Sequence, residues 1–204
     1  VGCLADISVF SFHPRKSLTT GEGGMITTDN QEWADWMKSY KRFGVSKNKN
    51  NSLETFEIIG SNYKMSDILA ALGLSQIKIF DKLICKKLKL VERYVKTLEK
   101  NKKVVLPKVC PKGKHSYQSF CILVENRDQI MMEMKDRGIE VQIGTYALHL
   151  HSAFQNNSLI KIKGDLKNSK WVYDHCLSLP LFPQMTFEEQ DKVVENLLEI
   201  LDRS

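Results

Sequence analysis

The residues with the clearest chemical potential lie in one stretch near the start of the chain, SVFSFHPRKSLTTGEGGMITT from Ser8 to Thr28. Its single lysine, Lys16, follows a mostly apolar strand, Ile7 to Phe12, which we expect to be buried. Because ligands of α/β proteins gather at strand ends, Lys16 is placed where a ligand could bind. A lysine in a partly desolvated pocket has a lowered pKa, and its neutral amine can form a Schiff base with a carbonyl.

Small and hydroxyl-bearing residues surround this lysine. Glycine lets the backbone turn with positive φ or approach a ligand closely, and hydroxyl groups suit a phosphate. The glycines are Gly21, Gly23 and Gly24, and the hydroxyl residues are Ser11, Ser17, Thr19 and Thr20. The stretch is not a standard phosphate loop, because the lysine precedes the glycines and GxxxxGK[ST] is absent. On chemistry alone, a Schiff-base lysine and a structural surface lysine are equal alternatives.

The elements that position this stretch can be predicted for the first half of the chain. Strands are expected on both sides of the Lys16 turn, the second at Gly24–Thr28. Asp29 or Asn30 can cap a helix that runs to about Phe43, where Gly44 ends it. The polar run SKNKNNS, residues 46–52, predicts a loop. Ser66 caps a long helix that continues, with or without a break, to about Lys100.

The second half alternates strands and helices, which indicates an α/β or α+β class. Thr186 and Glu189 form a capping box before a last helix that ends near Asp202. The other predicted elements are strands at Val104–Leu106, Phe120–Val124 and Ile139–Ile143 and a helix at Arg127–Arg137 that Gly138 closes.

Composition limits the classes of protein. The 204 residues are 42% hydrophobic and carry a net charge of +6, which suits a globular domain and permits acidic partners. The lysine-rich segment Lys82–Lys103 has helical spacing, which favours a solvated helix face over a nucleic-acid interface. No apolar run is long enough to span a bilayer, and no signal peptide is recognisable.

The five cysteines, Cys3, Cys85, Cys110, Cys121 and Cys176, are odd in number and widely spaced. They show no metal-ligand spacing, so we expect no metal site and a reduced, cytoplasmic compartment. The chain begins at Val1, directly before an apolar strand, and we expect it to be a piece of a longer protein.

Two segments resemble one family in particular. SFHPRKSLTTGEGG, from Ser11, is similar to the lysine motif of the DegT/DnrJ/EryC1/StrS family of sugar aminotransferases, which depend on pyridoxal 5′-phosphate (PLP). GSNYKMSDILAALGLSQI, Gly60–Ile77, resembles the family's GxNYRM segment. TYALHLHSAF and LSLPLFPQMTFEEQDKVV, which start at Thr145 and Leu177, resemble later family elements less specifically. The four segments occur in the family's order.

The resemblance implies a role for each matching residue. Lys16 matches the lysine that holds PLP as a Schiff base and moves the proton during catalysis. Ser11 matches a serine that binds the PLP phosphate, and Asn62 matches an asparagine that reaches a phosphate in the neighbouring subunit. The active sites would then be shared across a homodimer. Tyr146 and His149 fall in the element near the sugar. His13 could lie near the site or be a turn or core histidine.

The resemblance also implies a partial fold. It predicts an α/β, fold-type-I PLP-dependent transferase with three parts: the end of the large cofactor domain (1–65), a connecting helix or helices (66–100) and a small α/β C-terminal domain (101–204). The family's chain is about twice as long. Its missing N-terminal half carries a phosphate-binding threonine, an aromatic residue that stacks on the pyridine ring and an aspartate that pairs with the ring nitrogen.

Three positions depart from the family pattern. Ala147 replaces the usual proline, Lys64 the usual arginine and Ser17 a common asparagine. Because Lys16 is a lysine and not the histidine of a dehydrating branch, transamination is favoured over dehydration.

The predicted activity is therefore transfer of an amino group from an amino acid, expected to be glutamate, to a nucleotide-linked keto-sugar. Nucleic acid and membrane are not expected as partners. Two alternatives remain: a non-catalytic remnant of the fold, and a basic binding module that uses Lys82–Lys103.

Overall fold

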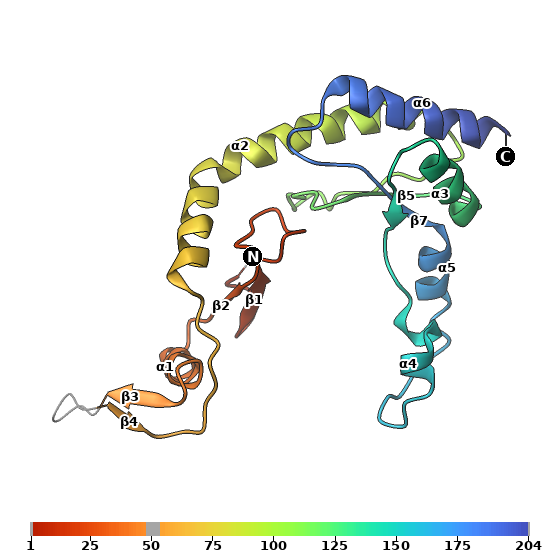
Figure 1. Cartoon of the computed structure of the whole chain (residues 1–204). Helices are drawn as coiled ribbons and strands as arrows, with labels where there is room; N and C mark the ends of the chain where they lie inside the picture. Colours follow the sequence, from red (N-terminus) through yellow and green to blue (C-terminus); the bar gives the residue numbers. More distant parts are fainter. Residues whose placement is uncertain (1, 48–53, 204) are drawn as a thin grey trace. The chain divides into compact units, whose positions relative to one another are not determined.

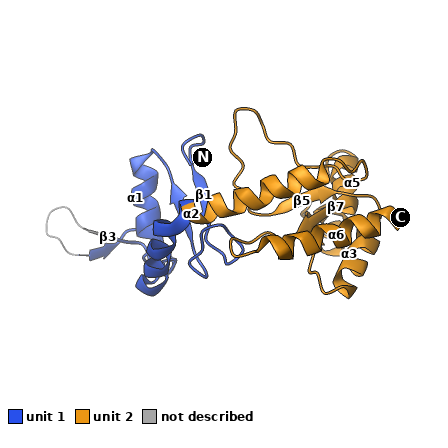
Figure 2. Ribbon diagram, turned by 90° about the horizontal axis from the view of Figure 1, so that it is seen from above, with its two compact units in different colours: residues 1–81 blue, residues 82–204 orange. Residues whose placement is uncertain are grey.

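The computed structural model describes residues 2–47 and 54–203 (Figure 1). The chain divides into two compact units, residues 1–81 and residues 82–204, which Figure 2 colours separately. Each unit has its own sheets, and each is described by itself below. The boundary lies inside one helix, so the three-part division predicted from the sequence stays a prediction.

Unit 1 begins with a two-stranded antiparallel ribbon. β1 (Ser8–Ser11) pairs with β2 (Gly24–Thr27), and the register places Ser11 opposite Gly24. Both predicted strands are confirmed, each slightly shorter than expected. The expected burial of the first strand is wrong for this chain, because the side chain of Val9 is 74% exposed. A two-stranded ribbon has two faces and a small unit cannot cover both.

α1 (Gln31–Tyr40) follows the ribbon. The Asn30 side chain accepts a hydrogen bond from the Trp33 amide at 3.1 Å, which confirms the predicted N-cap. The helix ends at Tyr40, three residues before the predicted end, and Gly44 follows with φ of +84°. The helix buries none of its residues within this chain, and Trp36 is 52% exposed.

A second ribbon replaces part of the predicted polar loop. β3 (Val45–Lys47) pairs with β4 (Glu54–Phe56) in antiparallel register. The loop prediction is wrong at Ser46 and Lys47, because β4 supplies hydrogen-bond partners that a polar sequence does not reveal. The rest of that predicted loop lies outside the described residues.

α2 (Asp67–Leu98) is a single continuous helix that crosses the boundary between the units. Its predicted start is confirmed, since the Ser66 hydroxyl accepts from the Leu69 amide at 3.4 Å. The helix shows no break.

Unit 2 is built on a three-stranded antiparallel sheet. The strand order is β5 (Phe120–Leu123), β7 (Cys176–Leu179) and β6 (Gln142–Ile143). The sequence prediction missed β7, which is the central strand. The predicted strand at 104–106 is wrong, since Val105 forms only an isolated bridge with Leu123, and the predicted strand at 139–143 shrinks to β6.

Helices surround this sheet. The predicted helix closed by Gly138 is confirmed as α3 (Arg127–Asp136), and the last helix is α6 (Phe187–Arg203). The capping box is formed as predicted: the Thr186 amide donates to Glu189 Oε2 at 2.8 Å, and the Glu189 amide donates to Thr186 Oγ1 at 3.1 Å. Three short helices were not predicted: η1 (Leu148–Leu150), α4 (Ser152–Gln155) and α5 (Lys167–His175).

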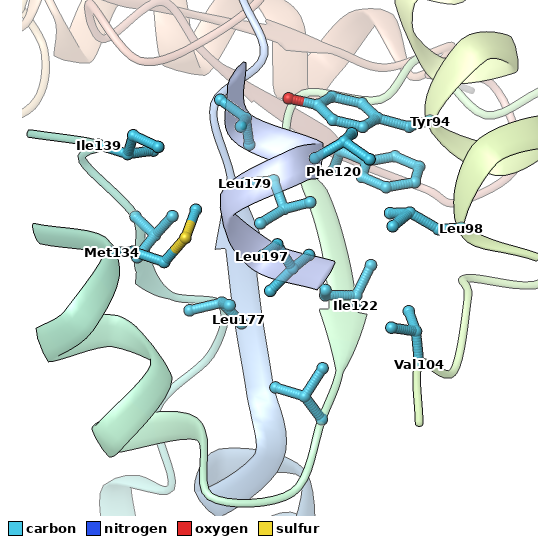
Figure 3. Close-up of a cluster of buried hydrophobic side chains, with 14 of the residues drawn as sticks. Tyr94, Leu98, Val104, Phe120, Ile122, Met134, Ile139, Leu177, Leu179 and Leu197 are labelled. Carbon is cyan, nitrogen blue, oxygen red and sulfur yellow. The ribbon is translucent and has the colours of Figure 1, made fainter. Parts of the chain in front are cut away.

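The core of unit 2 lies on one face of the sheet, where Figure 3 shows Tyr94 and Leu98 next to Phe120, with Leu177 and Leu197 close by. The rings of Tyr94 and Phe120 stack with centroids 4.9 Å apart. The Tyr94 hydroxyl donates to the Pro180 carbonyl at 2.9 Å, which satisfies a buried polar group. Burial raises the pKa of Tyr94, so this hydroxyl remains a donor.

The lysine-rich segment is only partly a solvated helix face. Lys87 is 5% exposed, and its Nζ donates to the Gln118 carbonyl at 3.3 Å. Burial lowers the pKa of Lys87. Lys103 lies beyond the end of α2 and is exposed, and its Nζ donates to the Leu201 carbonyl at 2.5 Å. The expectation of a solvated face is therefore wrong at Lys87, whose ammonium group is bound by a loop carbonyl.

Across residues 2–47 and 54–203, no helix combines the length and the apolar character that crossing a membrane requires.

Candidate functional site around Lys16

The two ends of the loop that carries Lys16 are joined by hydrogen bonds to the backbone of Phe12. The Phe12 amide donates to the Gly23 carbonyl at 2.9 Å, which continues the pairing of β1 with β2. The Phe12 carbonyl accepts from the Thr20 amide at 3.0 Å and from the Thr19 hydroxyl at 2.9 Å. These three bonds fix both ends of the loop, so the turn at its tip starts from a defined frame.

Lys16 lies in the turn at the tip of this loop. Its amide donates to the His13 carbonyl at 2.9 Å, and the His13 Nδ1 accepts from the Arg15 amide at 3.2 Å. His13 thus stabilises the turn through its own ring. The Lys16 side chain is exposed. The partly desolvated pocket predicted from the sequence is not formed around it by the described residues of this chain.

Ser11 stands at the end of β1, at the base of the same loop, and its side chain is exposed. Its hydroxyl oxygen accepts from the His13 amide at 3.3 Å. A hydroxyl that accepts one bond still has its own hydrogen to donate, for example to a phosphate oxygen.

The two consecutive glycines of the loop are required by close packing. A Cβ at Gly24 would lie 2.7 Å from the Phe10 carbonyl oxygen. Gly23 has φ of +144°, and a Cβ there would lie 2.8 Å from Thr20 Oγ1 and 2.7 Å from Met65 Cε. The two glycines of GEGG therefore allow the backbone at the start of β2 to pack closely against its neighbours, which is a structural role.

Asn62 is held by backbone pairing to the segment after α1. The Ser61 amide donates to the Tyr40 carbonyl at 2.9 Å, and the Tyr63 amide donates to the Lys41 carbonyl at 3.1 Å. Asn62 forms an isolated bridge with Arg42 between these two bonds. Its side chain is exposed, and its Oδ1 accepts from Lys64 Nζ at 2.6 Å. Lys64 therefore orients the Asn62 amide, a contact that the sequence did not reveal.

Tyr146 and His149 lie in unit 2, just after β6. Tyr146 is 58% exposed, and its ring centroid lies 6.0 Å from those of His151 and Tyr173. His149 is half-buried in η1. The aromatic neighbours of Tyr146 are thus His151 and Tyr173, which the sequence analysis missed because Tyr173 lies on the unpredicted helix α5.

A buried arginine supports this aromatic group. Arg127 is buried, and its guanidinium lies 5.4 Å from the centre of the Tyr173 ring. Its Nη1 donates to the Cys176 carbonyl at 3.3 Å, and its Nε lies 2.6 Å from Asp128 Oδ1. Ala147, where the family usually has proline, is fully buried next to Tyr146.

The five predicted site residues are therefore divided between the units. Ser11, Lys16 and Asn62 belong to unit 1, and Tyr146 and His149 belong to unit 2. Within the described part of the chain, no group of three or more histidine, cysteine, aspartate or glutamate side chains could hold a metal ion.

The fold and the lysine loop define a class of protein, a partial fold-type-I aminotransferase of α/β class. The model of the DegT/DnrJ/EryC1/StrS aminotransferase family matches residues 1–198. The chain belongs to this family.

Two curated relatives match along nearly the whole chain. One is the spore coat polysaccharide biosynthesis protein SpsC of Bacillus subtilis, which is 31% identical over 98% of this chain and 55% of its own length. The other is the UDP-4-amino-4,6-dideoxy-N-acetyl-β-L-altrosamine transaminase of Campylobacter jejuni, which is 30% identical over 100% of this chain and 54% of its own length. The chain spans about half the length of the curated relatives it matches.

Solved structures show the same fold. Helicobacter pylori PseC, an aminotransferase involved in the biosynthesis of pseudoaminic acid, superposes with a TM-score of 0.90 at 26% identity. The match covers 100% of this chain and 55% of that one. A Streptococcus pneumoniae protein solved in its PLP-form shares the fold with a TM-score of 0.85 at 23% identity, over 99% of this chain and 53% of that one.

Proposed function

We propose that this chain supplies the lysine-bearing part of a PLP-dependent sugar aminotransferase. The observation that carries the proposal is the placement of Lys16 at the tip of a loop whose two ends are bonded to Phe12, one residue beyond Ser11. Family membership over residues 1–198 supports the same reaction class. The Lys82–Lys103 binding module gains no support, since Lys87 and Lys103 bond to the protein itself.

The residues of unit 1 fit PLP. Lys16 offers an exposed primary amine on a bonded turn, which can attach an aldehyde covalently. Ser11 offers a hydroxyl donor at the strand end, which suits a phosphate. Asn62 offers an amide on a separate bonded segment. We assign Asn62 to a phosphate in the neighbouring subunit of a homodimer, as the family resemblance implies.

When bound, PLP supplies the electron sink for the reaction. Lys16 would hold the cofactor covalently through its Nζ. When it is free, the same Nζ would take the proton from the substrate α-carbon as a general base and return a proton as a general acid. A guanidinium could not do this, because arginine does not lose its proton in proteins.

The proposed substrates are an amino-acid donor, glutamate, and a nucleotide-linked keto-sugar. Tyr146, with its exposed ring beside His151 and Tyr173, is assigned to the sugar side, together with His149. Sugar-nucleotide and polysaccharide enzymes among the relatives support this class of acceptor. We propose that the reaction takes place in the cytoplasm, which the five free cysteine thiols support.

Labelling tests the assignment of Lys16. A protein that carries the complete site is incubated with PLP, reduced with borohydride and mapped by peptide mass spectrometry. We expect a pyridoxyl group on Lys16 and not on Lys86 or Lys89, which are exposed on α2 and serve as matched controls within the chain. Equal labelling of the three lysines would contradict the proposal, since it would show only general amine reactivity.

The 204-residue chain alone is expected to bind PLP poorly and to be nearly inactive. The family resemblance assigns the ring-stacking aromatic residue and the aspartate that pairs with the ring nitrogen to the half of the relatives that this chain does not cover. Without that aspartate the cofactor is a poor electron sink. The measurement is amino transfer by this chain next to a full-length relative, and comparable rates would overturn the expectation.

A further inference from the structure

Two cysteines that are far apart in the sequence lie together on the sheet of unit 2. The register pairs Cys121 on β5 with Ser178 on β7, and Leu123 with Cys176. Cys121 and Cys176 are therefore diagonal neighbours on the same face of two adjacent strands. This is the face opposite the one that carries Phe120 and the core.

The sulfur atoms of Cys121 and Cys176 both lie close to the Cα of Gly144, on the side where another residue would carry its Cβ. A Cβ at this position would lie 2.3 Å from Cys176 Sγ and 3.2 Å from Cys121 Sγ. The Gly144 amide donates to the Cys176 carbonyl at 2.9 Å, so the close approach is fixed by a backbone bond. The space that a side chain would take at residue 144 is thus filled by two thiols, which brings their sulfurs next to each other.

The two thiols have different surroundings. Cys121 is half-buried, and the hydrogen bond with Cys176 lowers the pKa of Cys121 to about 6. Hydrogen bonds from Ser119, whose Oγ lies 3.6 Å away, and from Ser178 act in the same direction, as does the charge of His115. These contributions outweigh burial, which acts in the opposite direction.

Cys176 is 6% exposed, and its pKa is raised by the hydrogen bond to Cys121 and by burial, against a smaller effect of Arg127. Cys121 is thus the more accessible sulfur and the one whose pKa is lowered, and Cys176 lies almost fully buried beside it, which suits an attacking and a resolving cysteine.

We propose that Cys121 and Cys176 are a peroxide-reactive dithiol that closes to an intrachain disulfide. The Cys121 thiolate attacks hydrogen peroxide: an S–O bond forms, the O–O bond breaks and hydroxide leaves. The Cys176 sulfur then attacks the sulfenic acid of Cys121: the S–S bond forms, the S–O bond breaks, and the hydroxide that leaves takes the Cys176 proton as water. The hydroxide from the first step takes up a proton from the solvent, equal to the one that Cys121 released on ionising, so that two thiols are oxidised and one peroxide is reduced to two waters. The proposal does not depend on the aminotransferase function.

Mass spectrometry tests the disulfide in a background where Cys3, Cys85 and Cys110 are replaced by serine. These three cysteines are exposed, so their replacement leaves the packing of unit 2 unchanged. After treatment with hydrogen peroxide and alkylation, we expect one linked peptide pair that contains Cys121 and Cys176 and that dithiothreitol separates. Full alkylation of both cysteines after peroxide would overturn the proposal, and so would over-oxidation of Cys121 beside a free Cys176.

Two further measurements separate the roles of the cysteines. With Cys176→Ser, peroxide should leave a sulfenic acid on Cys121 that dimedone traps, whereas Cys121→Ser should leave Cys176 unoxidised. The pH dependence of alkylation is measured on the reduced protein in which only Cys121 and Cys176 remain. The rate at which iodoacetamide alkylates Cys121 should reach half its maximum near pH 6, because the thiolate fraction rises as the pH passes the pKa. Faster oxidation of Cys176 than of Cys121 would contradict the assigned order.

Discussion

Replacing Lys16 with alanine is expected to lower kcat/KM for amino transfer by about a thousandfold or more in a protein that carries the complete site. General acid–base catalysis alone contributes about 10²–10⁴-fold, and Lys16 is proposed to attach the cofactor as well. The fold of the loop should survive, because the turn is held by the Lys16 amide and by Phe12, which alanine at position 16 leaves intact. Steady-state kinetics with a keto-sugar acceptor give the measurement.

Lys16→Arg separates the chemical role from a role of the positive charge. Arginine keeps the charge at the loop tip, but its guanidinium neither attaches the cofactor nor accepts a proton. The arginine variant is therefore expected to be as inactive as the alanine variant. Added methylamine should restore part of the activity of Lys16→Ala, since it supplies the missing base.

Lys86→Ala is the matched control, because Lys86 is an exposed lysine on α2 outside the proposed site. It should keep the parent activity. An active Lys16→Arg enzyme would show that only charge is needed, and the proposed function would then be wrong.

The sequence predicted the local features of the lysine loop and its neighbours well. Caps are set by short-range hydrogen bonds, and those of Asn30, Ser66 and Thr186 all form as expected. The hairpin around Lys16 follows from two apolar runs separated by turn residues.

The features that the sequence did not predict depend on partners distant in the chain. β7 is the central strand of unit 2, but CLSL is too short and irregular to show strand periodicity. Its neighbours Cys121 and Gly144 come from β5 and from the segment after β6, so the dithiol could not be recognised from cysteine spacing. The side-chain partners of Tyr146 were missed for the same reason.

The exposure of Lys16 and Val9 has a different cause. The sequence pattern predicts a turn-containing loop after an apolar strand, and this loop forms, but burial depends on what covers the ribbon. This chain spans about half the length of its relatives, and its own residues leave both side chains exposed. An apolar sequence pattern therefore predicts a strand more reliably than it predicts the burial of that strand.

Replacing Gly44 with alanine is expected to release the segment that carries Asn62. Gly44 has φ of +84°, and a Cβ there would lie 1.7 Å from the Ile58 carbonyl oxygen. The oxygen belongs to the backbone, and the position of the Cβ is fixed by the backbone of residue 44, so no side-chain rotation can relieve the overlap. The Glu57 amide donates to the Gly44 carbonyl at 3.1 Å, and this bond would also be displaced. We expect a local cost of about 3 kcal/mol or more, from backbone strain and overlap together.

Gly21→Ala is the matched control in the same unit. Gly21 has nearly the same φ, +82°, but the nearest atom to its Cβ would be Leu69 Cδ2 at 4.0 Å, which is ordinary contact. Its replacement should lower the free energy of unfolding only by the strain of a left-handed backbone conformation, about 1–2 kcal/mol. The difference between the two variants therefore isolates the overlap with Ile58.

Amide hydrogen exchange measures how strongly each variant loosens the segment around Asn62. The Ser61 and Tyr63 amides are bonded to the Tyr40 and Lys41 carbonyls and flank Asn62. In Gly44→Ala the protection factors of these two amides should fall by about a hundredfold, which corresponds to the expected cost in free energy. If an amide of the parent protein has a protection factor below about a hundred, its protection should be lost completely. In Gly21→Ala it should change by less than about tenfold at these amides. Equal losses in the two variants would show that Asn62 is not held by the close approach of Gly44 to Ile58, and the proposed positioning of Asn62 for a phosphate would lose its structural basis.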